Sequence, residues 1–166
     1  MSALPCFVGI GSNLSQPSLQ IADAIKALRA LADVSLVAVS SLYKTDPMGP
    51  ADQPEYLNAV AQLTTTLGPL SLLDALQGIE NEQGRERSNG RWTARTLDLD
   101  LLLYGNDEIQ NSRLTVPHPG MTVRSFVLVP LIEIAPDIVI PGKGRAADFL
   151  ETCEDFGIQR VETHDE

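Results

Sequence analysis

The sequence has few of the residues from which redox centres, structural metal sites and catalytic triads are built. Its 166 residues include two cysteines, two histidines and one tryptophan. Cys6 and Cys153 form no metal-ligand or redox spacing, so we expect two free thiols in a reducing compartment. With His118 and His164 as the two histidines, neither a Ser/His/Asp nor a Cys/His triad is supported.

Long apolar runs and positive charge are also scarce. The stretch Phe7–Ile10 is far too short for a signal peptide or a membrane span, and the N-terminus lacks a basic region. We therefore expect a cytoplasmic protein that does not associate with membranes. The net charge of −10 argues against a general binder of nucleic acids or anionic membranes. Neither the phosphate-binding G-x-x-x-x-G-K-[ST] loop nor the protein-kinase motif set is present.

The remaining composition is that of an ordinary globular protein, with 43% hydrophobic and 20% charged residues. A chain of this length buries a core without disulfides or a structural metal. We find no internal repeat, low-complexity segment or linker. We therefore predict a single domain over residues 1–166, with an acidic tail, about 162–166, that frays.

The hydrophobic pattern predicts strands and helices in the order β-α-β-β-α-β, followed by smaller elements. The predicted strands are Cys6–Ile10 (ended by Gly11-Ser12-Asn13), Val34–Tyr43, Tyr56–Thr66, Thr96–Tyr104 and Asp137–Ile140. The predicted helices are Ser18–Ala32, Pro69 to Gly84, Arg124–Ile134 (ended or kinked at Pro130) and Arg145–Glu151. This order predicts an α+β fold of ferredoxin-like type, in which helices flank a sheet containing antiparallel strands in three α-β-α layers.

Two aspartates stand close together on the predicted strand Thr96–Tyr104. Alternate strand residues face the same side, so Asp98 and Asp100 project together, roughly 6–7 Å apart. Their charges repel unless a cation such as Mg²⁺ neutralises them. An exposed polar face of an antiparallel sheet is an equally good interpretation of this motif alone. We expect Leu102 and Tyr104 to continue the aspartate face. The opposite face would hold Leu97, Leu99, Leu101 and Leu103.

Arginines cluster just before these aspartates. Six of the nine arginines fall within forty residues: Arg85, Arg87, Arg91, Arg95, Arg113 and Arg124. Guanidinium groups suit phosphate oxygens, and together with paired carboxylates they form the two halves of a phosphoryl-transfer site. The alternative is a solvated surface in which Glu82 and Glu86 pair with the arginines. Trp92 offers a flat surface for a ligand or simply packs the loop on the core.

Three further residues suggest recognition of a substrate. Tyr56 and Asn58 share one strand face, so a ring and an amide converge as they would on a flat heterocycle. An aromatic cross-strand pair beside a structural asparagine is the simpler interpretation of that spacing. His118, between two prolines, either donates to a phosphate or is an isolated surface histidine.

Taken together, these motifs resemble one family, the 6-hydroxymethyl-7,8-dihydropterin pyrophosphokinases. The similarity extends from about Phe7 to Asp148. The motifs that carry it are, in order, Gly9-Ile10-Gly11-Ser12-Asn13, Tyr43 to Pro50 (YKTDPMGP), Asp52 to Val60 (DQPEYLNAV), Arg85-x-Arg87, Arg91 to Asp100 (RWTARTLDLD), Val116 to Pro119 (VPHP) and Arg124 to Leu131 (RSFVLVPL). So many motifs in a fixed order are far more specific than any one of them.

The resemblance implies an enzyme of folate biosynthesis that moves pyrophosphate from ATP to the hydroxymethyl group of the pterin, giving AMP. It implies two Mg²⁺ ions on Asp98 and Asp100 and a clamp on the polyphosphate by Arg85 and Arg95. For the pterin it implies Thr45, Pro47, Met48, Tyr56, Asn58 and Phe126. For ATP it implies Gln77, Glu80, Arg87, Trp92, Arg95, Leu101, Arg113, Thr115, His118 and Arg124. ATP and the pterin are thus the expected partners of a monomer.

The sequence departs from the family pattern at Thr93 and Ala94, where a small residue and often a proline are usual, so loop closure and rate could differ. Two other classes of protein compete with this interpretation. A nucleotidyltransferase also pairs a Gly-Ser turn with a strand D-x-D, but there the two are close in sequence, whereas Ser12 and Asp98 are far apart. An RNA-binding module of this fold would be expected to carry basic charge and aromatic residues on the sheet.

Overall fold

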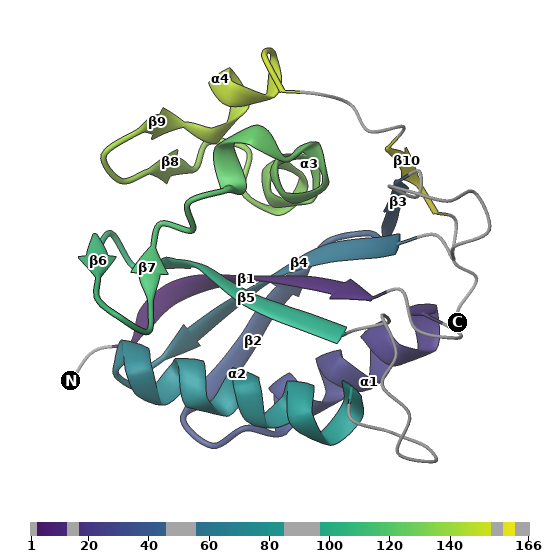
Figure 1. Ribbon diagram of the computed structural model, residues 1–166, viewed down its shortest axis with the longest axis vertical. Coiled ribbons are helices and arrows are strands. Elements are labelled where there is room, and N and C mark those ends of the chain that lie inside the picture. The colour runs from purple at the N-terminus through teal and green to yellow at the C-terminus, as the bar shows by residue number, and fades with distance from the viewer. Residues whose placement is uncertain (1–2, 13–16, 46–55, 85–96, 154–157, 162–166) are drawn as a thin grey trace.

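The computed structural model describes residues 3–12, 17–45, 56–84, 97–153 and 158–161. Its centre is an antiparallel sheet in which β1 (Leu4–Ser12) lies between β4 (Tyr56–Thr65) and β5 (Leu97–Tyr104). β2 (Val34–Val39) and β3 (Tyr43–Thr45) both pair with β4, and β10 (Gln159–Arg160) pairs with β3. The predicted ferredoxin-like α+β fold is confirmed (Figure 1).

The strand predicted over Val34–Tyr43 is two strands, β2 and β3, that pair with successive parts of β4. The break falls at Ser40, whose backbone N–H donates to the carbonyl of Val60 at 2.9 Å. The Ser40 hydroxyl in turn accepts the Val60 N–H at 2.9 Å, in place of a strand carbonyl. A side chain therefore replaces one rung of the ladder, which the alternation of apolar residues did not indicate.

Helices α1 (Pro17–Ala30) and α2 (Pro69–Gly84) cover one face of the sheet (Figure 1). The predicted stripe of α2 is buried there as a whole: Leu72, Leu73, Leu76 and Ile79. It packs with Ile21 and Leu28 of α1 against apolar residues of β1, β4 and β5. In the described residues, no helix is long and apolar enough to span a membrane.

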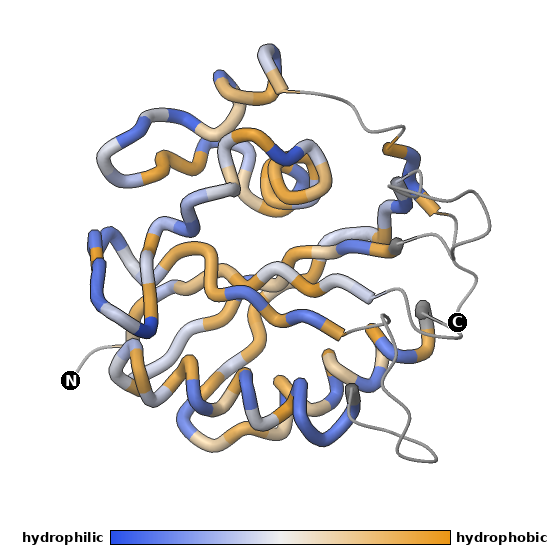
Figure 2. The backbone as a smooth tube through the Cα atoms, viewed as in Figure 1, coloured by the Kyte–Doolittle hydropathy of each residue, from blue (hydrophilic) through white to orange (hydrophobic). Residues whose placement is uncertain are grey.

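The other face is covered by α3 (Ser125–Ile134), with α4 (Ala146–Leu150) and the hairpin β8–β9 (Val139–Ile140, Gly144–Arg145) beyond it (Figure 1). α3 is apolar along most of its length, as Figure 2 shows. Its buried residues Leu128 and Leu131 pack with Met121 of the 3-10 turn Met121–Val123 against Phe7 and Val60. Pro130 was expected to end or kink this helix; the helix runs through Pro130 to Ile134, so Pro130 does not end it. The result is the predicted α-β-α layering.

β5 contains a bulge that the sequence pattern did not indicate. Phe7 pairs with Leu103 but Val8 pairs with Leu101, so Leu102 is an extra residue on β5. The side chains therefore change face after Leu101. Leu102 and Leu103 both pack on the α3 side, and Tyr104 packs on the α1–α2 side. The expected faces of Leu103 and Tyr104 were thus wrong, whereas those of Leu97, Leu99, Leu101 and Leu102 were right.

A small hairpin follows β5 and leads toward α3. It consists of β6 (Ile109–Gln110) and β7 (Thr115–Val116), which we did not predict from the sequence. After β7 the chain returns to the bulge, because the backbone N–H of His118 donates to the carbonyl of Leu102 at 3.0 Å. The bulge thus fixes the position of the His118 loop relative to β5.

Candidate functional site

The site is organised by two rows of paired residues that cross β4, β1 and β5. One row is Asn58, Gly11 and Asp98, and the other is Val60, Gly9 and Asp100. Directly paired residues point to the same side of a sheet, and Val60 packs on the α3 side. Asn58 and both aspartates therefore face α3. Because both positions on β1 are glycines, no β1 side chain stands between the amide and the carboxylates.

The glycines Gly9 and Gly11 are part of β1, which continues to Ser12. The prediction that Gly11 ends the strand was therefore wrong. Gly9 has ordinary packing room, since a Cβ placed on it would lie 3.5 Å from Leu102 Cδ1. The motif Gly9-Ile10-Gly11 thus serves as the middle of the site floor, and its alternation of glycines on one strand face is the signal that sequence reasoning missed.

Asp98 and Asp100 are each half-buried. Burial raises the pKa of Asp100; the charge of Asp98 adds to the rise, whereas His118 and Arg124 oppose it. Among the described residues, no group of three or more His, Cys, Asp or Glu side chains converges. Two half-buried carboxylates on one strand face suit Mg²⁺, which takes one or two carboxylates and keeps its other positions for water and substrate phosphates. The donor set therefore fits the predicted metal.

Glu80 of α2 approaches β5 from its edge. Its Oε2 accepts the backbone N–H of Leu99 at 2.6 Å, between the two aspartates. Burial raises the pKa of Glu80; the Leu99 N–H lowers it, and Asp98 and Asp100 raise it further. β5 is an edge strand of the sheet, so this carboxylate covers an edge amide. The predicted contact of Glu80 with the nucleotide stays a prediction.

His118 is near enough to Asp100 and Arg124 for their charges to act on its pKa. Its Nδ1 accepts the backbone N–H of Gly120 at 3.1 Å. The neutral ring must then carry its proton on Nε2. Burial lowers the pKa of His118, with Asp100 raising it and Arg124 lowering it. A neutral imidazole with a defined Nε2–H is a hydrogen-bond donor suited to a phosphate oxygen.

Arg124 and Phe126 stand at the start of α3, next to His118. The guanidinium carbon of Arg124 lies 5.9 Å from the centroid of the Phe126 ring, within the range of a cation–π contact. Both side chains are half-buried. α3 thus brings the residue predicted to stack on the pterin next to a residue predicted to meet the nucleotide.

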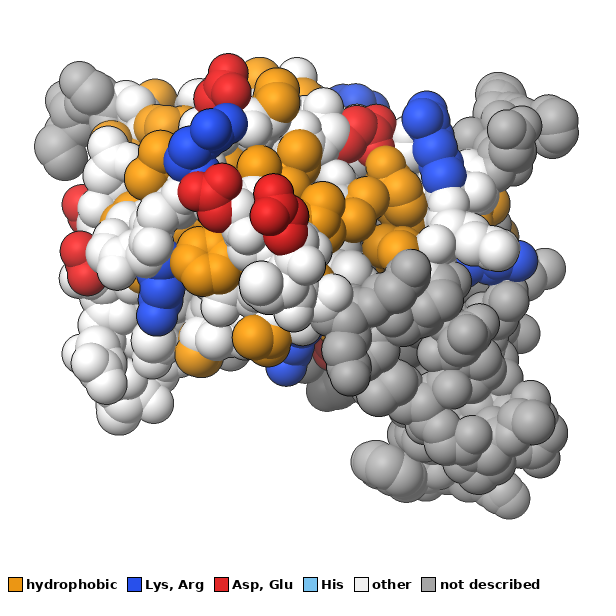
Figure 3. All heavy atoms as spheres, turned by 90° about the horizontal axis from the view of Figure 1, so that it is seen from above, with side chains coloured by type: hydrophobic (Ala, Val, Ile, Leu, Met, Phe, Trp, Pro, Cys, Tyr) orange, Lys and Arg blue, Asp and Glu red, His pale blue; other side chains and the backbone are white. Residues whose placement is uncertain are grey.

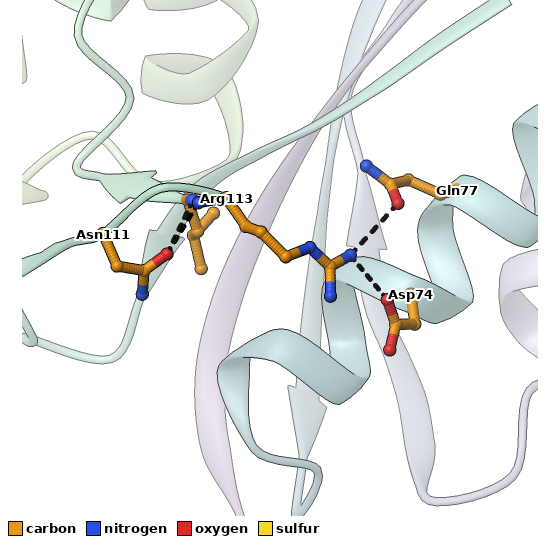
Figure 4. Close-up of polar contacts among 5 residues, drawn as sticks. Asp74, Gln77, Asn111 and Arg113 are labelled. Carbon is orange, nitrogen blue, oxygen red and sulfur yellow. Dashed lines mark hydrogen bonds and ion pairs between the residues drawn. The ribbon is translucent and has the colours of Figure 1, made fainter.

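A second cationic group lies at the other side of β5. The Nη2 atom of Arg113 is 2.6 Å from Asp74 Oδ1 and 3.3 Å from Gln77 Oε1, both on α2 (Figure 4). Asn111 holds this turn, because its Oδ1 accepts the backbone N–H groups of Arg113 at 2.9 Å and Leu114 at 3.0 Å. Two predicted nucleotide residues, Arg113 and Gln77, are therefore neighbours. We did not predict a role for Asp74 from the sequence, because its partner Arg113 lies too far along the chain for the pairing to be inferred.

The remaining predicted residues lie in several parts of the fold or outside the described residues. Thr45 is buried at the end of β3, and its alternation with Tyr43, the partner of Asn58, places it on the α3 face. Thr115 is exposed on β7, whereas Leu101 is 3% exposed within the α1–α2 core. The backbone of Tyr56 begins β4. The others lie outside the described residues: Pro47, Met48, Arg85, Arg87, Trp92 and Arg95.

Glu133 of α3 makes a connection to the sheet that sequence reasoning missed. Its Oε1 accepts the Tyr43 hydroxyl at 2.6 Å, and its carboxylate also accepts the Ser41 N–H at 3.0 and 3.1 Å. Burial alone would raise the pKa of Glu133, but Tyr43, Ser41 and Arg160 together lower it. Burial and Glu133 raise the pKa of Tyr43 to about 12. The one visible signal is an acidic residue inside an otherwise apolar helix.

The surface around α3 and α4 mixes acidic, basic and apolar side chains (Figure 3). On this face, as far as the described residues show it, no continuous basic field is present, which does not favour the RNA-binding alternative. On the α3 face of a ferredoxin-like sheet, paired carboxylates and a buried amide lie with Arg124 and with a histidine that can donate a hydrogen bond. This combination is that of a phosphoryl-transfer class of enzyme.

The family comparison identifies the member of that class. Residues 7–136 match the model of the family described as 7,8-dihydro-6-hydroxymethylpterin-pyrophosphokinase (HPPK). The chain belongs to this family. Its function is accordingly the pyrophosphokinase step of folate biosynthesis, and it is an enzyme, as predicted.

Similar proteins support this assignment. The chain is 56% identical over 152 residues to the 2-amino-4-hydroxy-6-hydroxymethyldihydropteridine pyrophosphokinase of Haemophilus influenzae, covering 92% of this chain and 94% of that one. It is 51% identical over 155 residues to the enzyme of that name from Pseudomonas aeruginosa, covering 93% and 95%. Among solved structures, wild-type Plasmodium falciparum HPPK-DHPS with pteroate matches with a TM-score of 0.69 at 13% identity. That match covers 91% of this chain but 42% of the longer one, and it supports the fold.

Proposed function

We propose that the two rows across β4, β1 and β5 form the place where ATP and 6-hydroxymethyl-7,8-dihydropterin meet. The observation that supports this best is the row Asn58–Gly11–Asp98. It sets a buried amide and a carboxylate on one face, two strands apart, with glycine between them. A strand spacing of about 4.8 Å makes this span roughly 10 Å, which suits a bicyclic pterin whose hydroxymethyl group reaches a metal-bound phosphate.

Asp98 and Asp100 would hold Mg²⁺, with two ions expected from the family resemblance. Bound there, the metal would neutralise the phosphate oxygens and orient the β-phosphorus for attack. The raised pKa of Asp100 is consistent with a pair of carboxylates that gains from a cation.

The pterin would lie on the β4 side of the site. The Asn58 amide, buried to 8% exposure, offers both donors and an acceptor to the edge of the ring. Phe126 would supply one stacking surface, and Tyr56 the other. Thr45, Pro47 and Met48 would complete this pocket, the last two from outside the described residues.

The nucleotide would lie across β5 and its two flanking cationic groups. Arg113 with Gln77 would meet it from the α2 side, and His118 with Arg124 from the α3 side. Glu80, Thr115 and Leu101 would be near it. From outside the described residues we propose Arg85, Arg87, Trp92 and Arg95, with Arg85 and Arg95 clamping the polyphosphate.

In the reaction, the hydroxymethyl oxygen attacks the β-phosphorus in line and forms a new O–P bond. The bond between that phosphorus and the bridging oxygen to the α-phosphate breaks, and AMP leaves with the bridging oxygen. The hydroxyl proton is released to solvent, and we assign no general base among the described residues. His118 and Arg124 contribute a hydrogen-bond donor and a positive charge to the phosphates, so positioning and electrostatics carry the step.

Product analysis tests this proposal. The protein is incubated with MgATP, with and without 6-hydroxymethyl-7,8-dihydropterin, and followed by ³¹P NMR. We expect AMP and a pterin diphosphate, both strictly dependent on the pterin. Release of ADP or of pyrophosphate, or AMP formation that ignores the pterin, would contradict it. We also propose that the protein is cytoplasmic and a monomer. For a monomer, light scattering during size exclusion should give a mass near 17.9 kDa.

A further inference from the structure

Gly120, between His118 and Arg124, carries no side chain at a point where one would collide with a cation. A Cβ built on Gly120 would lie 2.9 Å from both Cζ and Nε of Arg124 and 3.0 Å from its Nη2. The guanidinium therefore lies directly on the backbone of Gly120. The dihedral angles of Gly120, φ −94° and ψ −1°, are open to other residues, so the backbone conformation does not require glycine.

The backbone around Gly120 has little freedom to move away from an added side chain. Its N–H donates to His118 Nδ1 at 3.1 Å, and its carbonyl accepts the N–H of Val123 at 3.3 Å. The next residue, Met121, is fully buried in the α3-side core and donates its N–H to the His118 carbonyl at 3.2 Å. An added methyl group would therefore displace the flexible Arg124 side chain and leave the loop in place.

The Arg124 guanidinium is close to several other groups of the site. Its guanidinium lies 5.9 Å from the centre of the Phe126 ring, and its charge acts on both Asp100 and His118. A guanidinium packed between two groups in this way loses less rotamer entropy on meeting a ligand than a fully exposed one does.

We propose that Gly120 is a positioning residue, which by lacking a side chain seats the Arg124 guanidinium between the Gly120 backbone and the Phe126 ring, ready to meet the ATP phosphates. The inference rests on the proposed function and deepens it. It means that glycine is needed at position 120 to place Arg124, whereas the fold does not depend on it. Phosphate recognition here would then depend on a glycine that itself touches neither substrate.

A double-mutant cycle tests this proposal through the rate of pterin-dependent AMP release. The variants are Gly120→Ala, Arg124→Ala and the double variant. We expect Gly120→Ala to lower kcat/KM for ATP on the order of 10- to 100-fold, as when a hydrogen bond to a charged group is lost. KM for the pterin should change less. If Gly120 acts through Arg124, adding Gly120→Ala to Arg124→Ala should cause no further loss.

The matched control is Gly68→Ala, since a Cβ on that exposed glycine meets nothing within 4 Å. Thermal unfolding of all variants should stay close to that of the wild type. Wild-type activity in Gly120→Ala, or losses that multiply in the double variant, would overturn the inference. Absence of AMP release by the wild type would instead contradict the proposed function. In that case ATP binding by the three variants, measured by calorimetry with the magnesium salt of a non-hydrolysable analogue, still tests the seating of Arg124 by the same non-additivity.

Discussion

Asn58 is the residue on which substrate identity depends most directly in the proposed site. It is 8% exposed on the α3 face, in the same row as Asp98 and two strands away from it. A buried amide left without its ligand must be satisfied in another way, and a ligand that matches its donors and acceptor gains specificity from it. In the proposed site, this amide would distinguish a pterin pocket from a site that binds only polyphosphate.

Asn58→Ala should therefore raise KM for the pterin by about 10- to 100-fold, the effect of one or two lost hydrogen bonds. KM for ATP should remain near that of the wild type, because Asn58 lies on β4 and the nucleotide is proposed to lie across β5. Initial rates with each substrate varied in turn would measure this. An unchanged pterin KM would exclude Asn58 from the pterin pocket.

Single residues also show how far sequence reasoning reaches. The shared face of Asp98 and Asp100 follows from strand alternation alone, and the structure has them so. Glu133 and Gly120 could not be found that way, because their partners depend on how distant segments pack. The faces of Leu103 and Tyr104 were predicted wrongly for the same reason. The extra residue in β5 is defined only by its pairing with β1, which the sequence of β5 alone does not reveal.

At the scale of elements, the hydrogen bond from the Tyr43 hydroxyl to Glu133, 2.6 Å long, joins β3 to α3. It is a bond between side chains and is not part of the strand pairing. Both elements reach the proposed pterin pocket: β3 ends there at Thr45, and α3 begins there with Phe126 in its first turn. The connection should therefore help to fix the width of that pocket.

Tyr43→Phe should lower stability by about 1 kcal/mol, the typical value of one hydrogen bond, and Tm by about 2–4 °C. Because the folded pKa of Glu133 is lowered, its contribution is present above the pKa of the unfolded state and is lost as pH falls through the folded value. The Tm difference between wild type and variant should accordingly shrink in acid. A difference that grows as pH falls would contradict the assignment.

The edge of β5 is a second feature of this scale, since the Glu80 carboxylate covers the Leu99 amide. Glu80→Ala should speed hydrogen exchange of the Leu99 amide by about tenfold or more, because its acceptor is gone. Glu80→Gln is the matched control: it keeps a carbonyl oxygen and should retain most of the protection. Equal exchange in all three proteins would show that Glu80 does not secure this edge.

The element order was predictable because each long element has a strong apolar period, and β1, α1, β4, α2 and β5 all formed where the period indicated. The break at Ser40 and the small hairpin β6–β7 carry no such period. They arise from side-chain and loop contacts that become defined only when the sheet has assembled.

At the scale of the whole molecule, two apolar cores lie on opposite faces of one sheet and have different roles. The α1–α2 core fixes the back of β1, β4 and β5, while the α3 core leaves the start of β5 uncovered enough for half-buried aspartates. A net charge of −10 makes a site for polyanions costly unless cations are concentrated there. Arg113, Arg124 and the paired aspartates with their metal would meet that need.

The rate of pterin-dependent AMP release by Asp100→Asn tests this account most directly. The substitution keeps the size of the side chain and removes one charge of a repelling pair, so the fold should be at least as stable at neutral pH, where the raised pKa of Asp100 marks a cost of ionisation. We predict that turnover falls by at least about 100-fold, with unfolding unchanged or slightly shifted upward. A folded variant that releases AMP at close to the wild-type rate would contradict the assignment of the metal and with it the site.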